Sequence, residues 1–118
     1  MFQKFCIKQG DLWPPLEAYL LQADNAAIPL EEDDIVKFIM TPKNDRRNVI
    51  IDEEAEIVDL DTGYVRYTWQ PGDTDVADTY QAEFLVMLHG DTPIRVPNNG
   101  YFIITIDHKL GYEEGQGS

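Results

Sequence analysis

The chain has 118 residues and a formal net charge of −13, from 22 acidic and 9 basic residues, and 43% of its residues are hydrophobic. This length suits one domain around one core, and so acidic a surface disfavours binding to nucleic-acid phosphates and to anionic membranes. The single cysteine, Cys6, excludes an intramolecular disulfide, and we see neither a secretory signal nor a membrane-spanning apolar stretch, so we expect synthesis in a cytoplasm.

Turn signals recur about every ten residues along the chain, which is typical of an all-β protein. The first apolar run contains Cys6, whose thiol we expect to be buried and inert. The clearest alternation of apolar residues lies in residues 79–88, and Asp61-Thr62-Gly63 is a hairpin turn signal. The predicted strands are residues 2–8, 16–22, 35–41, 49–51, 55–58, 64–69, 79–88, 94–96 and 101–106.

Short strands at this spacing predict an immunoglobulin-like antiparallel β-sandwich of about 7–8 strands. We assign residues 1–110 to this single domain. Residues 111–118 are rich in Gly and Glu, and we expect them to form a flexible acidic tail.

Three aromatic residues have predicted places in such a sandwich. Trp69 alternates with Val65 and Tyr67 and is expected in the core. Tyr80, at the start of the strongest strand, is expected to donate its hydroxyl to a loop backbone, as in a tyrosine corner. Trp13 precedes two prolines and is not placed by any periodicity, so it is a candidate for an exposed binding residue.

The loop after Trp69 holds Asp73, Asp75 and Asp78, which are open to two interpretations. Together with Asp59 or Asp61 they would offer oxygen ligands for Ca²⁺, although their spacing does not match an EF-hand loop. Alternatively, they form a solvated loop with local turn hydrogen bonds, which we favour. The same two interpretations apply to the acidic runs at 31–34 and 52–54, and we predict no bound metal or other cofactor.

Catalytic patterns are sparse in this sequence. The only histidines are His89 and His108, both at strand ends beside polar residues, and the only serine is Ser118. No nucleophile motif, phosphate loop or zinc-ligand spacing occurs, and nothing orients Cys6 toward a histidine. We therefore predict that the protein is not an enzyme.

Several segments together resemble a known module. They are KQGDLWPP at 8–15, GYVRYTWQPGDT at 63–74, DTYQAEF at 78–84 and VPNNGY at 96–101. The pattern, which spans about residues 5–106, resembles the immunoglobulin-like module of tailed bacteriophages that is related to the N-terminal domain of upper baseplate proteins. Asp78 departs from it, since that family usually has glycine there.

The resemblance implies a β-sandwich component of the virion, made in the bacterial host cytoplasm, with no catalytic residues to carry over. Baseplate members continue into a further region after this module. A free-standing copy is therefore expected to be a neck, head-to-tail, tail or baseplate accessory protein that binds other phage structural proteins in several copies within a symmetric assembly. The alternative is an adhesion module that binds a bacterial surface glycan or receptor.

A docking patch is the site that such a role requires. Leu85 and Met87 point to the outer face of the strongest predicted strand, opposite its core-facing residues. We take Trp13, Leu85 and Met87 as candidate docking residues, with burial of Leu85 and Met87 under a neighbouring loop as the alternative.

Overall fold

The computed structural model describes residues 4–111, and the predicted tail lies outside them except for Gly111. The prediction of an all-β sandwich is confirmed. Within residues 4–111 the fold has eight strands: β1 (Lys4–Lys8), β2 (Leu16–Tyr19), β3 (Ile35–Pro42), β4 (Ile51–Asp59), β5 (Tyr64–Tyr67), β6 (Asp78–Leu88), β7 (Thr92–Val96) and β8 (Phe102–Asp107). Within the described residues there is no helix, and so none that would cross a membrane.

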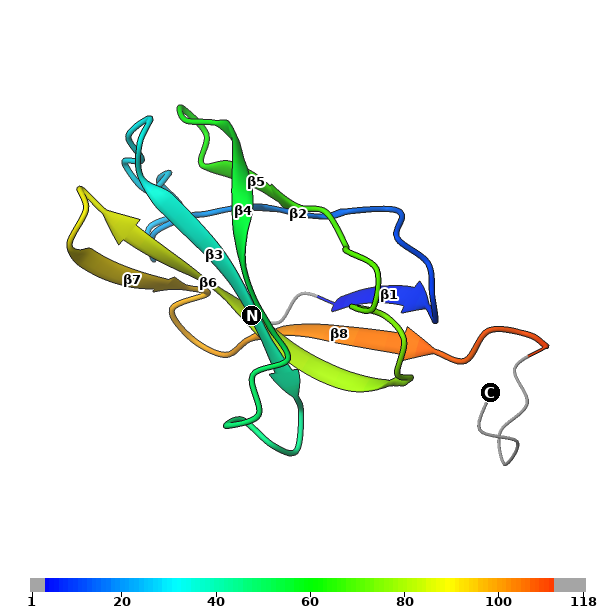
Figure 1. Ribbon diagram of the computed structural model, residues 1–118. Coiled ribbons are helices and arrows are strands. Elements are labelled where there is room, and N and C mark those ends of the chain that lie inside the picture. The colour runs from blue at the N-terminus through cyan, green and yellow to red at the C-terminus, as the bar shows by residue number, and fades with distance from the viewer. Residues whose placement is uncertain (1–3, 112–118) are drawn as a thin grey trace.

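The strands form a sheet of order β1-β8-β6-β3-β4-β5-β2 that folds over into two layers and nearly closes as a barrel (Figure 1). The first layer contains β1, β8, β6 and β3, and β7 also pairs with β6, beyond the end of β8. Strand β4 connects the layers, because its first half pairs with β3 and its second half with β5, which in turn pairs with β2. We call these layers the β6 layer and the β5 layer.

Two details differ from the predicted sandwich. Strand β1 pairs with β8 in parallel, from Lys4 opposite Ile103 to Lys8 opposite Asp107, so the sheet is mixed, whereas the other strand pairs are antiparallel. The two short strands predicted at 49–51 and 55–58 are a single strand, β4. The acidic run between them continues the strand because Asp52 and Glu54 are exposed, and Asp52 forms an ion pair with Lys37 of β3.

The core lies between the layers, and Phe38 of β3 is at its centre. The Phe38 ring stacks on Tyr67 at 4.6 Å between centroids and packs edge-on against Trp69 and at a tilt against Phe84. Trp69 is 1% exposed, as predicted, and its Nε1 donates to the Pro14 carbonyl at 3.1 Å. This aromatic cluster therefore joins strands of both layers to the loop before β2.

The loop ends are fixed by hydrogen bonds to backbone groups, one from a side chain and one from the backbone. Tyr80 is buried, and its hydroxyl donates to the Val76 carbonyl at 2.6 Å, which confirms the predicted corner. Gly63 has a φ of 70° in the β4–β5 turn, and its carbonyl accepts the Leu20 N–H at 2.8 Å. The Asp61-Thr62-Gly63 turn is thus confirmed, and it also anchors the segment that follows β2.

Candidate docking surfaces

Leu85 and Met87 lie side by side on the outer face of the β6 layer, and both are half-buried. The register places Ile35 of β3 opposite Met87 and Met87 opposite Pro93 of β7. Ile35 is 45% exposed, and Pro93 is exposed. We call Ile35, Leu85, Met87 and Pro93 the outer apolar row. A sheet face turned to water usually carries polar side chains, so these residues form an unusual apolar surface.

Charged residues flank this row and continue into a hollow. Leu85 lies between Lys37 of β3 and Arg95 of β7, and Arg95 forms an ion pair with Glu83 at 2.6 Å. Beside them is a hollow of about 300 Å³. It is lined by Ile39, Thr41, Arg46, Val49, Gln81, Ala82, Glu83, Arg95 and Tyr101. This face therefore offers apolar contact next to charge, as protein interfaces often do.

Trp13 lies elsewhere, in the loop between β1 and β2. Figure 1 shows this loop at the opposite end of the molecule from the β6–β7 turn. Its side chain is 76% exposed, and Val76 in the facing β5–β6 loop is 65% exposed. The structure thus does not bring Trp13 together with Leu85 and Met87. The predicted patch is two separate surfaces.

The Trp13 loop is held in place by long-range hydrogen bonds. The Gly10 N–H donates to the Thr74 carbonyl, and the Thr74 hydroxyl donates to the Asp11 carbonyl at 2.9 Å. Gln9 Nε2 donates to the Asp75 carbonyl at 3.0 Å. Because these bonds hold the backbone of the loop before any partner binds, the loop backbone would lose little conformational entropy on contact.

Two of the three aspartates that follow Trp69, Asp73 and Asp78, accept local hydrogen bonds through their carboxylates. The Asp73 carboxylate accepts hydrogen bonds from the Tyr67 hydroxyl and the Gln70 N–H, and Asp78 accepts from the Thr79 N–H. Burial, and then the bond to Asp73, raise the pKa of Tyr67. These contacts are the local turn hydrogen bonds of the second interpretation, and the grouping of possible metal ligands found among residues 4–111 lies elsewhere.

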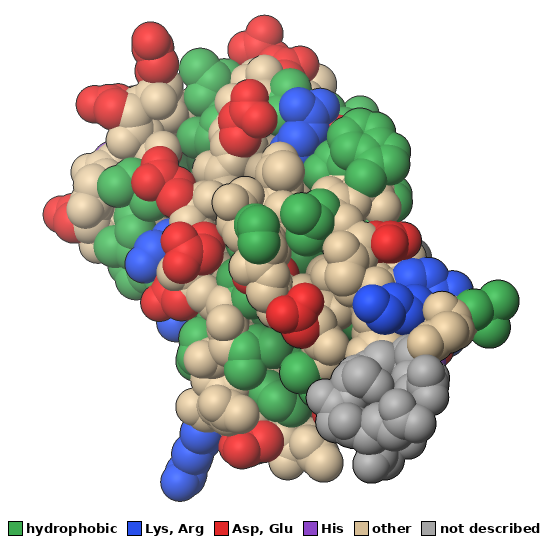
Figure 2. All heavy atoms as spheres, turned by 45° about the vertical axis from the view of Figure 1, so that its right-hand side comes forward, with side chains coloured by type: hydrophobic (Ala, Val, Ile, Leu, Met, Phe, Trp, Pro, Cys, Tyr) green, Lys and Arg blue, Asp and Glu red, His purple; other side chains and the backbone are tan. Residues whose placement is uncertain are grey.

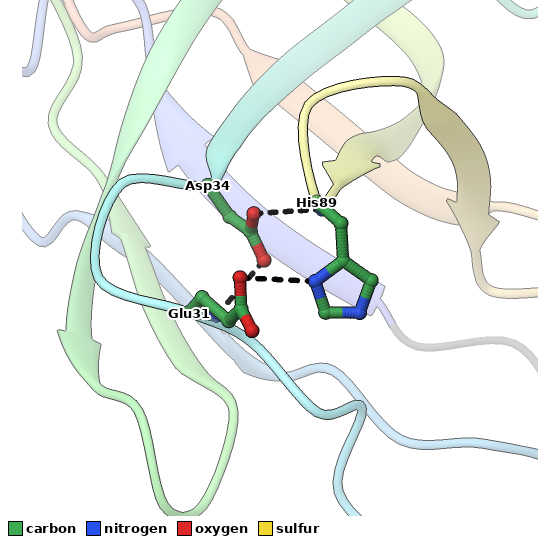
Figure 3. Close-up of side chains that lie close together, drawn as sticks. All are labelled: Glu31, Asp34 and His89. Atoms are coloured by element: carbon green, nitrogen blue, oxygen red, sulfur yellow. Dashed lines mark hydrogen bonds and ion pairs between the residues drawn. The ribbon is translucent and has the colours of Figure 1, made fainter.

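That grouping is Glu31, Asp34 and His89, shown in Figure 3. Asp34 is 8% exposed, and its carboxylate accepts the Glu31 N–H at 2.8 Å and the His89 N–H at 2.9 Å. His89 Nδ1 lies 3.0 Å from Glu31 Oε1. The residues thus join the segment before β3 to the β6–β7 turn, and the existing contacts account for the cluster without an ion.

The Glu31–His89 pair makes stability depend on pH. The hydrogen bond to Glu31, and then its charge, raise the pKa of His89 above its ordinary value of 6.5. A raised histidine pKa contributes stability that is fully present below about pH 6.5 and is lost as pH rises through the folded-state pKa. We therefore expect Glu31→Gln to lower the urea midpoint at pH 5.5 and to leave it nearly unchanged at pH 8.5.

Glu32→Gln is the matched control, since Glu32 is the exposed neighbour of Glu31. It removes the same charge and should shift the midpoint by a similar small amount at both pH values. Equal pH dependence in the Glu31→Gln and Glu32→Gln variants would show that the Glu31–His89 contact is not formed in solution.

Cys6 contradicts its prediction, because its side chain is exposed. It lies between Phe5 and Ile7 in β1, and Ile7 is the member of this run that is buried. Phe5 and Ile7 share one face of β1, whereas Cys6 shares the other face with Lys4 and Lys8, so the alternation of the strand turns Cys6 outward. The two histidines contact other residues: His89 contacts Glu31, and His108 Nδ1 lies 3.3 Å from Gln9 Oε1.

Acidic side chains outnumber basic ones on the surface that Figure 2 shows, and hydrophobic side chains lie among them. No protein-family model matches the chain, and neither characterised proteins nor solved structures show significant similarity to it.

Proposed function

We propose that the protein is a non-enzymatic structural component of a tailed bacteriophage particle that docks on a larger symmetric assembly. The observation that carries the proposal is the outer apolar row, which leaves Ile35, Met87 and Pro93 as neighbours on a sheet face. The motifs at 8–15 and 63–74, which resemble phage immunoglobulin-like modules, support the phage setting.

Docking through a sheet face suits a component present in many copies. Apolar groups at the centre of an interface provide most of its binding energy, and charged groups around them set orientation. Lys37 and Arg95, on either side of Leu85, would supply that orientation. Repeated weak contacts around a ring add up through multivalency, so one small surface per copy is sufficient.

The proposal is tested by incorporation of the chain into particles. In phage carrying Met87→Asp, we expect the amount of this chain per purified particle to fall by at least about tenfold, as for loss of an interface hot spot. Val58→Asp is the control, because Val58 is 39% exposed and lies on β4, outside the outer apolar row. Normal incorporation of a folded Met87→Asp chain would overturn this docking surface.

A second function has one observation in its favour. Trp13 is exposed on a fixed loop, and an exposed indole stacks well on the apolar face of a sugar ring. An adhesion module that binds surface glycan would therefore use Trp13. Binding of the chain to a bacterial glycan array, abolished by Trp13→Ala, would favour this function over the structural one.

A further inference from the structure

A groove runs along the open side of the sandwich, where the two layers do not close into a barrel. One part, a hollow of about 360 Å³, is lined mainly by apolar residues, among them Ile28, Leu88 and Ile94. A second part, of about 210 Å³, continues to Tyr19 and Phe102. The two parts share Leu21, Gln22, Ala23, Val96 and Asn98 and so form one groove.

One wall of this groove is the backbone edge of β7. Ile94, Arg95 and Val96 all line it, although successive side chains of a strand point to opposite faces. Only an approach to the strand edge contacts three consecutive residues in this way. The other wall, Leu21–Ala23, is also three consecutive residues.

The edge of β7 is open to pairing. Within residues 4–111, β7 pairs with β6 alone. Pro93 has no N–H to donate, so we expect its backbone to face the open edge, where prolines are tolerated in sheets. Arg95, two residues on, then faces the same way and presents its N–H and C=O to the groove.

The groove favours one kind of occupant. An extended peptide with alternating apolar side chains fits both features of this site. Its backbone would pair with the free edge of β7 as an added strand, and its apolar side chains would fill the hollow. The flanks of such a peptide should be basic. Residues 20–34 contain five acidic residues and no Lys or Arg, and Asp91 lies in the β6–β7 turn.

Two occupants with this chain's own sequence fit the groove poorly, its C-terminal residues and a second copy. Residues 112–118, YEEGQGS, are acidic and nearly devoid of apolar side chains. A second copy that paired β7 with β7 about a two-fold axis would bring like charges together, both Arg95 and the acidic segments. A different protein is therefore the better occupant.

We propose that β7 and the groove bind an extended apolar segment with Lys or Arg flanks from a partner protein, which becomes an added strand. The inference rests on the proposed function, because it names the kind of partner segment with which the docked chain would interact. It uses the backbone edge of β7 and the groove, whereas the outer apolar row uses side chains on the sheet face, so the two can be tested by different variants.

The test uses the full chain, labelled with ¹⁵N, and three synthetic peptides. The probe is Lys-Lys-Val-Thr-Val-Thr-Val-Lys-Lys; one control replaces Val with Ser, and the other replaces Lys with Glu. We expect amide shifts at residues 21–23 and 94–96 with the probe, and slower hydrogen exchange of the Arg95 amide. Both controls should bind at least about tenfold more weakly.

Two variants separate backbone pairing from side-chain contact. Arg95→Pro removes the edge donor, whereas Arg95→Ala removes the ion pair with Glu83 but keeps the N–H. We expect Arg95→Ala to bind the probe and Arg95→Pro to lose at least about tenfold in affinity. If Arg95→Pro fails to fold, Leu21→Glu replaces it, because Leu21 is 38% exposed on the opposite wall.

Equal binding by Arg95→Pro and Arg95→Ala, shifts outside the groove, or no binding of the probe would overturn the inference. None of these outcomes bears on whether the chain is incorporated into particles. Conversely, a chain missing from particles that still binds the probe would contradict the proposed function and leave the groove as a peptide site.

Discussion

Trp69→Ala should remove a large share of the stability of the fold. Trp69 is 1% exposed and packs against Phe5, Phe38 and Tyr67. Truncating a buried tryptophan to alanine costs about 3–5 kcal/mol, and a small domain has only about 5–15 kcal/mol in total. The loss of the bond to the Pro14 carbonyl adds to this cost. The free energy of unfolding, measured in urea, tests the expectation.

Trp13→Ala is the matched control, since Trp13 is the other tryptophan and is exposed. We expect it to change the free energy of unfolding by no more than about 0.5 kcal/mol. Similar losses in the two variants would contradict the placement of Trp69 at the centre of the core and of Trp13 on the surface.

Gly63→Ala should cost more stability than the same substitution at Gly10, Gly72 or Gly90. Gly63 has a φ of 70°, and an added Cβ would lie 2.7 Å from the Leu20 carbonyl oxygen. The positive φ costs an alanine about 1–2 kcal/mol, and the overlap with backbone adds about 1–3 kcal/mol. We expect a loss of about 3 kcal/mol in the free energy of unfolding.

Gly10→Ala separates the cost of the positive φ from the cost of the overlap with neighbouring backbone. Gly10 has a φ of 80°, and an added Cβ would meet no atom within 4 Å. It should therefore cost only the conformational part, about 1–2 kcal/mol. Equal losses in the free energy of unfolding for the two variants would contradict the close approach of the β4–β5 turn to the segment after β2.

The strands that could be predicted from the sequence are those with one face in the core. In β6, Tyr80, Ala82, Phe84 and Val86 alternate with less buried residues, and the structure buries all four. Period-two patterning identifies such strands because only one face lies against the other layer.

Strand β4 was predicted as two short strands because its alternation of apolar residues is interrupted. Glu53 shares a face with the buried Ile51 and Ala55 but is exposed. At Glu53 the strand pairs with β3 on one side, and β5 pairs only from Glu56 onward. A strand that changes partner in this way has no continuous core face, so its alternation breaks where the layers meet.

The docking surface was only partly predictable for a similar reason. Leu85 and Met87 follow from alternation along one strand, whereas Ile35 and Pro93 join them through cross-strand register. The contacts of Asp34 and Glu31 with His89 and the groove beside β7 also join segments far apart in the chain. Such groupings depend on topology, which the sequence pattern does not specify.

Cryo-electron microscopy of purified particles from the source tests the structural role most directly. The account predicts density for this chain in a symmetric ring on the particle, with Ile35, Leu85 and Met87 covered by a neighbouring protein. Absence of the chain from every particle would contradict the structural role. Density in which the outer apolar row faces solvent would contradict the docking surface.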